Sequence, residues 1–171
     1  PSPLPPPPLG FRLLTLHQHW VDAGLVPPRA NEGTVSIATL LSRSALRGAT
    51  ELHIHDYMID LDFLVDDVAP AIRSVPRVVV LHGDGRPPHA RCVAREPQRF
   101  VCLQPPCERY GTHHSKMLLV VKPHELTVAI TTANFIFADV HNKTNGVWTH
   151  TFPRRAAASA SPGVAAAAAA A

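Results

Sequence analysis

The run Arg77–His82, with the sequence RVVVLH, is the feature that most constrains the fold of this chain. Three consecutive valines in an extended strand place apolar side chains on both faces, so both faces need a covering layer. The segment Gly83-Asp84-Gly85 then ends the run in a turn. A strand of this kind is typical of layered α/β domains, because their sheets are buried between other elements.

Further strands and helices are predicted to alternate around this run. Apolar alternation and flanking turn residues predict strands at 50–59, 100–103, 114–121, 126–132 and 146–152. Helices are predicted at 34–46, with Thr34 as the capping residue, and at 60–72, with Asp60 as the N-cap. Residues 86–99 are rich in Pro and Arg and are expected to be irregular or briefly helical. The alternation predicts one layered α/β domain.

Both ends of the 171-residue chain have biased compositions. Residues 1–10 form a proline-rich tail and residues 154–171 form a low-complexity, Ala-rich tail, and neither composition can build a packed core. This leaves residues 11–153 as the folded unit. No apolar run approaches the length of a membrane span, and no secretory signal is recognised, so we expect no membrane partner.

Charge is distributed unevenly along the chain. Residues 11–85 carry six Arg and nine Asp or Glu, a net charge of −3, whereas residues 86–155 carry ten Lys or Arg and four acids, a net charge of +6. A basic second half predicts an anionic ligand there, and charge alone leaves nucleic acid and a small phosphate ester both open. The candidate phosphate contacts are Arg86, Arg91, Arg95, Arg99, Arg109, Lys122 and Lys143.

His114 and Lys116 are the best candidates for chemistry. Two residues apart in a predicted strand, they point to one face, and an imidazole and an ammonium so placed can bind one phosphate. A tight turn at Pro123 and His124 would pair His114 with Ala133 and bring Asn134 to the same sheet end. The neighbouring His113 is expected on the opposite face, in a structural role. The residues by themselves therefore predict an anion site at a sheet end.

The blocks GTHHSKMLLVV and TTANFIFADVHNKTNGVW closely resemble the first half of the tyrosyl-DNA phosphodiesterases, a eukaryotic branch of the phospholipase D superfamily. The superfamily motif is His-x-Lys followed by a polar residue, which is Asn in this branch; here these are His114, Lys116 and Asn134. Weaker similarity extends upstream, so the resemblance covers about residues 11–155. It implies a layered α-β-α phospholipase D-like half domain with a mixed sheet, incomplete in itself, over residues 11–153.

The resemblance also implies a mechanism. His114 would attack the phosphorus of a 3′-phosphodiester and form a phosphohistidine, while Lys116 and Asn134 would stabilise charge on the phosphoryl oxygens. The further substrate-binding residues would be Tyr110, Ser115, Thr132 and Asn145. No metal and no cofactor are implied. The partners would be DNA 3′ ends, single-stranded or duplex, and a topoisomerase-derived tyrosyl peptide as substrate, in DNA repair in the nucleus.

Three departures from the family pattern keep alternatives open. Asn145 stands where the family has Gln, Ala133 stands where it has Ser, and the family's second His/Lys/Asn set comes from a C-terminal half that this sequence lacks. That half, or a second copy of this chain, would have to complete the site. The alternatives are a homodimeric nuclease with a single motif and a degenerate nucleic-acid-binding domain without turnover.

Overall fold

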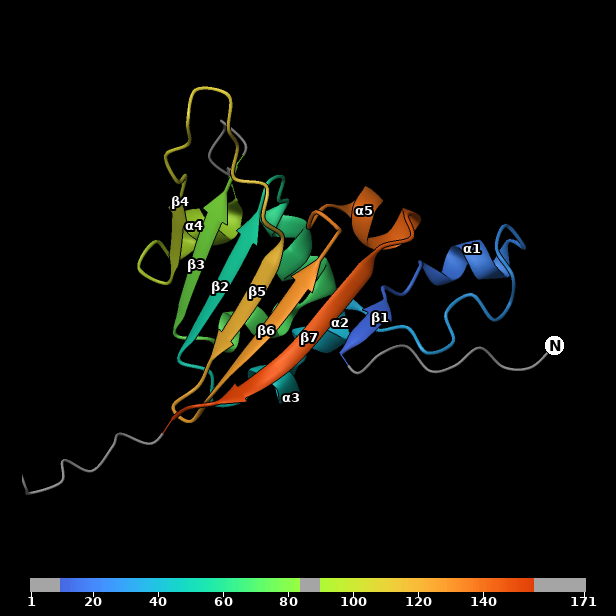
Figure 1. Cartoon of the computed structure of the whole chain (residues 1–171), viewed down its shortest axis with the longest axis horizontal. Helices are drawn as coiled ribbons and strands as arrows, with labels where there is room; N and C mark the ends of the chain where they lie inside the picture. The colour runs from blue at the N-terminus through green and yellow to red at the C-terminus, as the bar shows by residue number, and fades with distance from the viewer. Residues whose placement is uncertain (1–9, 84–89, 156–171) are drawn as a thin grey trace, which may run out of the picture.

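The computed structural model describes residues 10–83 and 90–155. Its strands form one mixed sheet in the order β1-β7-β6-β5-β2-β3-β4 (Figure 1). The strands are β1 (Phe11–Leu13), β2 (Glu51–Asp56), β3 (Arg77–His82), β4 (Phe100–Leu103), β5 (Met117–Val121), β6 (Glu125–Thr131) and β7 (Gly146–Pro153). The helices are α1 (Gln18–Asp22), α2 (Ile37–Leu40), α3 (Arg43–Leu46), η1 (Phe63–Val68), η2 (Pro70–Ser74), α4 (Arg91–Arg95) and α5 (Phe137–Asn142).

The strands β2, β3 and β4 run parallel, and β1, β7, β6 and β5 continue the sheet with antiparallel neighbours. The hairpin between β5 and β6 has the predicted two-residue turn, because Lys122 N donates to Glu125 O at 2.9 Å. Its predicted register is also confirmed, since Met117 pairs with Ile130. This register brings the start of β5 and the end of β6 to one end of the sheet.

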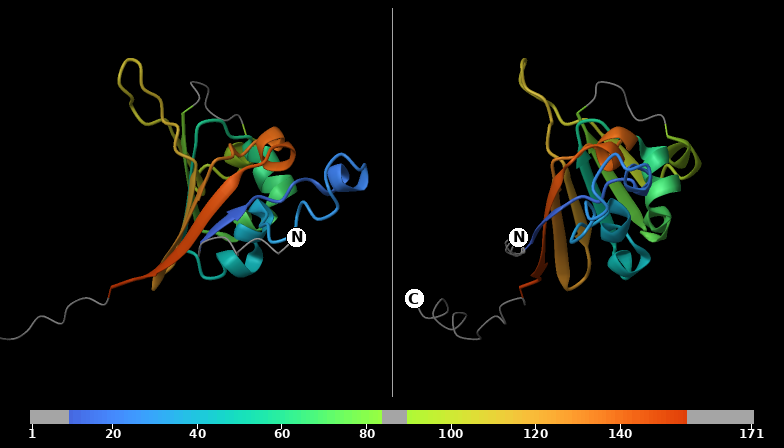
Figure 2. Two further views of the ribbon diagram at one scale, coloured as in Figure 1. Left: turned by 45° about the vertical axis from the view of Figure 1, so that its right-hand side comes forward. Right: turned by 90° about the vertical axis from the view of Figure 1, so that its right-hand side faces the viewer.

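The described helices lie on one face of the sheet, as the two side views in Figure 2 show. The prediction of an α/β half domain with a mixed sheet is confirmed. The second helical layer of the expected α-β-α arrangement is not among the described residues. On the opposite, open face the strands expose several large apolar side chains, with Phe11 42%, Leu103 49%, Ile130 50% and Phe152 44% exposed. Within the described ranges, none of the helices is long and apolar enough to cross a bilayer.

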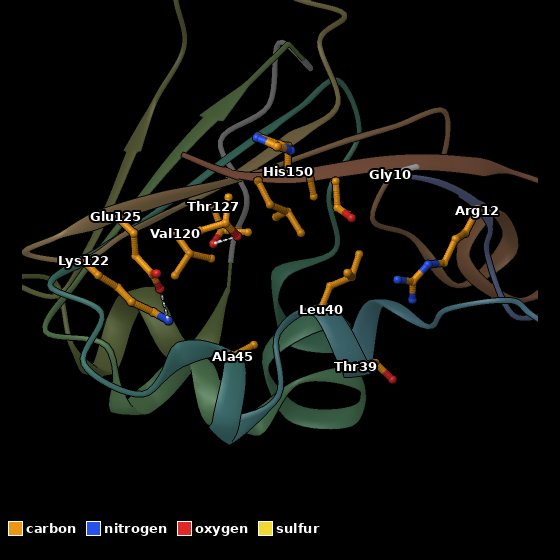
Figure 3. Close-up of a pocket in the computed structure, with 14 residues that line it drawn as sticks. Gly10, Arg12, Thr39, Leu40, Ala45, Val120, Lys122, Glu125, Thr127 and His150 are labelled. Carbon is orange, nitrogen blue, oxygen red and sulfur yellow. Dashed lines mark hydrogen bonds and ion pairs between the residues drawn. The ribbon is translucent and has the colours of Figure 1, made fainter. Parts of the chain in front are cut away.

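A cavity of about 650 Å³ lies between the helices α2 and α3 and the strands β5, β6 and β7 (Figure 3). It is lined by Leu40 and Ala45 from the helices, by Val120 from the sheet, and by the ion pair between Lys122 and Glu125, whose Nζ and Oε1 are 2.8 Å apart. Neither His114 nor Lys116 lines it. The cavity is therefore separate from the predicted anion site.

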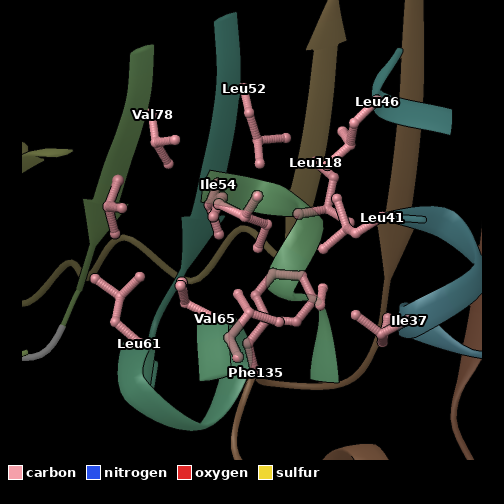
Figure 4. Close-up of a cluster of buried hydrophobic side chains, with 14 of the residues drawn as sticks. Ile37, Leu41, Leu46, Leu52, Ile54, Leu61, Val65, Val78, Leu118 and Phe135 are labelled. Carbon is pink, nitrogen blue, oxygen red and sulfur yellow. The ribbon is translucent and has the colours of Figure 1, made fainter. Parts of the chain in front are cut away.

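The hydrophobic core fills the space between the sheet and its helices (Figure 4). In β2 the side chains alternate, so that Leu52 and Ile54 are fully buried while His53 and His55 lie on the open face. In β3 all three valines are buried, although the described helices cover only one face of the sheet. Phe135, just after β6, is also fully buried and anchors that end of the chain in the core.

The predicted helix at 34–46 is wrong in its length and its cap. The segment forms two single-turn helices, α2 and α3, capped by Ser36 and Ser42 and not by Thr34. Each serine hydroxyl accepts from the backbone N–H three residues on, at Thr39 N and Ala45 N. Ser42 lies inside the apolar stripe and starts a second helical turn. Its hydroxyl competes for a backbone N–H that a continuous helix would bond to a carbonyl oxygen.

The predicted helix at 60–72 is present as two shorter pieces. Asp60 accepts from Phe63 N at 2.9 Å, as the predicted N-cap, and Leu61, Leu64 and Val65 are buried. The segment then forms the π-helical η1 and the 3₁₀-helical η2, which are separated at Ala69. Proline has no N–H and restricts the preceding residue, so Pro70 ends the first piece.

Two predicted strands are shorter in the structure than in the sequence pattern. The strand at 50–59 ends at Asp56, so Met58 lies beyond it and is exposed. The strand at 114–121 begins at Met117, so His114 and Lys116 precede it. The strands at 100–103, 126–132 and 146–152 are confirmed to within one residue. Predicted features at 1–9, 84–89 and 156–171 lie outside the described residues.

Candidate functional site

A row of buried polar side chains crosses the sheet at the ends of β2 and β3. Asp56 pairs in register with His82, and Lys116 directly precedes Met117, the partner of His55 in the sheet. Lys116 in turn accepts a hydrogen bond from Thr131 N at its carbonyl oxygen, at 3.0 Å. Asp56, His82, Lys116 and Thr131 are 0%, 3%, 8% and 7% exposed. The row lies on the helix-covered face, next to the apolar core.

His114 and Lys116 meet at the exposed rim of this row. Lys116 Nζ lies 3.3 Å from both Nδ1 and Nε2 of His114, and 3.3 Å from its carbonyl oxygen. The His114 ring is exposed to solvent and also contacts the ring of Tyr57, with 5.1 Å between the centroids. The expected strand does not hold this pair, because β5 begins at Met117, but the two side chains still lie together.

The segment that carries His113 and His114 can lie close to the end of β3 because residue 83 is a glycine. A Cβ at Gly83 would overlap the carbonyl oxygen of His113 and would lie 2.7 Å from Cδ2 of Tyr57. The ring of His113 packs beside His55 of the open face, at 5.5 Å, as expected for the face opposite His114. Glycine at 83 thus lets the segment before β5 lie against the end of β3.

Asn134 is held at the same sheet end by Asp139. Asp139 Oδ2 accepts from Asn134 Nδ2 at 2.7 Å and from Asn134 N at 3.1 Å. The next residue, Phe135, donates its N–H to Oδ2 of the buried Asp56. Among the described residues, no hydrogen bond joins Asn134 to His114 or Lys116. The structure therefore brings Asn134 to the site through Asp139 and Asp56, with its Oδ1 buried and without a partner.

Thr132 and Asn145 extend the same network. Thr132 Oγ1 donates to Asn145 Oδ1 at 2.8 Å, and Asn145 Nδ2 donates to the carbonyl oxygen of Asp139 at 2.8 Å. The amide oxygen and the amide nitrogen of Asn145 therefore both have hydrogen-bond partners within the chain. The strand β6 ends here because Thr131 Oγ1 accepts from Ala133 N at 3.1 Å, which turns the backbone out of the sheet.

Two other candidate residues lie apart from this network. Ser115 is exposed between His114 and Lys116. Tyr110 is 91% exposed on the long loop before β5, where the guanidinium of Arg109 lies 5.4 Å from its ring. The structure does not bring Tyr110 into contact with His114. Tyr57, which does contact His114, carried no signal in the sequence beyond its place inside the strand predicted at 50–59.

Asp139 was missed as a functional candidate although it lies in the block TTANFIFADVHNKTNGVW. It is 6% exposed, and its Oδ1 accepts from Lys143 Nζ at 2.6 Å. Burial by itself would raise the pKa of Asp139, but the hydrogen bonds from Lys143 and Asn134 outweigh it and hold the pKa below its ordinary value. Asp139 is therefore an anion that fixes the positions of Asn134 and Lys143.

We expect Asp139→Ala to lower the free energy of unfolding by about 1–3 kcal/mol, because it leaves the buried donors of Asn134 without their acceptor. Because the folded pKa lies below the unfolded value of 3.8, this contribution is present above about pH 4 and is lost as the pH falls further. Urea unfolding at neutral and acid pH measures it. The exposed Asp67 provides the control, Asp67→Ala. An equal effect of both substitutions contradicts the assignment.

Asp56 was also missed, although it continues the buried face of Leu52 and Ile54. Its side chain is fully buried, and Oδ1 has no hydrogen-bond partner. Burial raises the pKa of Asp56 to about 7, against the opposing effects of the Phe135, Tyr57 and Met58 N–H groups and of the charge on Lys116.

Most of the expected phosphate contacts are paired with acids in the described part of the chain. Arg91 bridges Asp62 and Asp66, and Arg99, Lys122 and Lys143 pair with Glu96, Glu125 and Asp139. Arg95 and Arg109 are exposed and are in none of the ion pairs found there, and Arg86 lies outside the described residues. Of the expected phosphate contacts in the described part of the chain, Arg95 and Arg109 are therefore the ones without an acid partner.

Together these groups can bind a phosphate and attack it. His114 offers an exposed imidazole as a nucleophile, and Lys116 offers a positive charge 3.3 Å away. Asn134 can present its remaining amide hydrogen to a phosphoryl oxygen, since one of its two donors is already used by Asp139.

The family model for tyrosyl-DNA phosphodiesterase matches residues 19–166 of this chain. Tyrosyl-DNA phosphodiesterase 1 of Arabidopsis thaliana is 33% identical over 147 residues, which cover 85% of this chain and 22% of that protein. A probable tyrosyl-DNA phosphodiesterase of Caenorhabditis elegans is 28% identical over 120 residues, which cover 70% of this chain and 26% of that protein. The chain thus spans about a quarter of the length of these relatives.

The fold is similar to that of a solved tyrosyl-DNA phosphodiesterase from yeast. The TM-score is 0.63 at 13% sequence identity, and the match covers 84% of this chain and 32% of the yeast chain. At this identity the likeness concerns the fold.

Proposed function

Because this chain belongs to the tyrosyl-DNA phosphodiesterase family, we propose that it is the first catalytic half of a phosphodiesterase that removes tyrosyl groups and related adducts from DNA 3′ ends. The observation that carries the proposal is the contact between His114 and Lys116, at 3.3 Å, inside the matched residues. The buried row beside it supports the proposal, because it holds Lys116 at one end of a rigid sheet.

In the first step, a ring nitrogen of His114 attacks the phosphorus. A bond forms between nitrogen and phosphorus, and the bond between phosphorus and the tyrosine oxygen breaks, so the tyrosyl peptide leaves with the electron pair of that bond. Lys116 neutralises the charge on the non-bridging oxygens, and Asn134 donates to one of them. The product is DNA linked through its 3′ phosphate to His114.

In the second step, water hydrolyses the phosphohistidine, and this requires a base. The sequence contains one His-x-Lys in a G-T-H-H-S-K context, so we propose that the acid and base come from a second catalytic half or a second copy of this chain. We propose the nucleus and DNA repair as the setting and DNA 3′ ends as the partner, by analogy with the family.

The test uses an oligonucleotide that ends in a 3′-phosphotyrosine. We expect the purified chain to form a covalent adduct with the DNA that is stable in alkali and labile in acid, as a phosphoramidate bond is. Denaturing electrophoresis and mass spectrometry of the His114 peptide measure the adduct. Phosphate found on a different residue contradicts the proposed mechanism.

Binding of single-stranded DNA should depend on salt. If about three phosphates are neutralised, the affinity falls with a log–log slope of about −2, or about sixteenfold between 50 mM and 200 mM salt. Fluorescence anisotropy with a labelled oligonucleotide measures this. We expect Arg95→Gln with Arg109→Gln to reduce the slope, and Arg29→Gln, in the acidic half, to leave it unchanged. An affinity that salt does not alter would remove DNA as the partner.

A further inference from the structure

The side chain of Asp56 occupies an unusual position for a carboxyl group. It is fully buried at the end of β2, and its Oδ2 accepts the N–H of Phe135 while its Oδ1 has no hydrogen-bond partner. A buried oxygen without a partner is costly, so such an atom in a folded protein calls for an explanation. A proton on Oδ1 would remove the charge that makes this burial costly.

Lys116 is the charged neighbour of this carboxyl. The register of β2 and β5 ends at the pair His55 and Met117, so Asp56 and Lys116 are the next residues beyond that pair, and the charge on Lys116 lowers the pKa of Asp56. On the other side of β2, Asp56 pairs in register with His82 of β3. The segment after β6 contributes the N–H of Phe135, which donates to the Asp56 carboxylate. The nearby Asp60 uses its carboxylate as the cap of η1, on Phe63 N. Lys116 is therefore the charge that Asp56 can neutralise.

A phosphodiester at this site would compete with Asp56 for the same ammonium group. When the site is empty, the charge of Lys116 favours the ionised form of Asp56, although no direct ion pair joins the two side chains among the described residues. When an anion binds at Lys116, the ionised carboxyl becomes a second negative charge beside the ligand, with little water to screen it. Protonation of Oδ1 removes that repulsion and leaves the full charge of Lys116 for the phosphate.

We propose that Asp56 is the buried counter-ion of Lys116, and that a phosphodiester binds at this site with the uptake of one proton from solvent onto Asp56. Asp56 is thus a positioning residue that acts through Lys116. The inference rests on the proposed function, since it takes Lys116 to be the phosphate-binding group. It adds that the site binds its substrate more tightly in mildly acidic solution.

The direction in which pH changes the affinity follows from the pKa of Asp56 before the ligand binds. Burial raises the pKa of Asp56 to about 7 in the unliganded chain, and the anion raises it further. The bound state therefore holds more protons than the free state, and affinity falls as the pH rises through 7. With the bound pKa well above 8, the affinity falls about fivefold between pH 7 and pH 8.

The experiment measures binding of a 3′-phosphotyrosyl oligonucleotide between pH 6 and pH 8.5 at constant salt. All variants carry His114→Gln, which stops the covalent step and removes the imidazole as a proton acceptor. We expect about a fivefold loss of affinity from pH 7 to pH 8 in the parent. With the added change Asp56→Asn, which is neutral and nearly equal in size, we expect less than a twofold change. The exposed Asp22 on α1 supplies the control, Asp22→Asn, which should behave as the parent.

A second measurement requires no substitution at Asp56. Carbon-detected NMR of chains labelled at the aspartate carboxyls follows the titration of Asp56 directly, and addition of the oligonucleotide should raise its apparent pKa by at least one unit. A pH dependence that persists in Asp56→Asn, or a titration that DNA does not move, overturns the assignment of Asp56 alone. Absence of binding by the parent at every pH overturns it together with the proposed function.

Discussion

The substitution His114→Ala is expected to abolish the covalent adduct with a 3′-phosphotyrosyl oligonucleotide. Removing a nucleophile cannot be compensated by the neighbouring groups, because Lys116 only supplies charge; the rate of adduct formation should fall by about four orders of magnitude or more. The measurement is single-turnover trapping on a denaturing gel, with a C-terminal half from a family member added in trans. DNA binding should persist, since Lys116 keeps its place on the buried row.

The matched control for this prediction is His113→Ala. His113 is the direct neighbour in sequence, but its ring packs beside His55 on the open face of the sheet. Its removal should leave adduct formation within a few-fold of the parent. If His114→Ala still forms the adduct, or if His113→Ala abolishes it in a folded chain, His114 is not the nucleophile.

The second large effect concerns turnover by the chain alone. We expect the 171-residue chain to form at most one adduct per molecule and then to stop. A phenol is a good leaving group, so attack can proceed without an acid, but hydrolysis of the phosphohistidine requires a base, which we assign to the second half. A steady-state assay should therefore show a burst without further product, and addition of a second half should restore turnover.

The oligomeric state of the protein in that assay distinguishes a chain that needs a second catalytic half from a homodimeric nuclease. The open sheet face exposes Ile130 and Phe152, and exposed apolar side chains favour association, so we expect self-association in light scattering. Ile130→Lys should reduce it. Multiple turnovers from a monomer contradict the need for a second half. Multiple turnovers from a dimer that is lost with Ile130→Lys favour the homodimeric nuclease.

Local patterns predicted much of the sheet. The strand Arg77–His82 was predicted at its observed bounds, because three valines in a row between turn residues leave few other solutions. The register of β5 and β6 followed from the two-residue turn at Pro123 and His124, since a turn of that length fixes which residues pair. Helix boundaries were predicted less well, because Ser42 and Pro70 interrupt apolar stripes that periodicity alone treats as continuous.

The chain's sequence by itself determined the pair His114 and Lys116, since their spacing and the surrounding motif are local properties. Only the tertiary structure decided what holds that pair. Asp56 and Lys116 are sixty residues apart in the chain and become neighbours through the pairing of β2 with β5. Asp139 accepts from Asn134 only because the chain turns out of β6 into α5. Burial and charge compensation depend on which strands lie side by side, and this is why a carboxyl with no motif of its own becomes part of the candidate site.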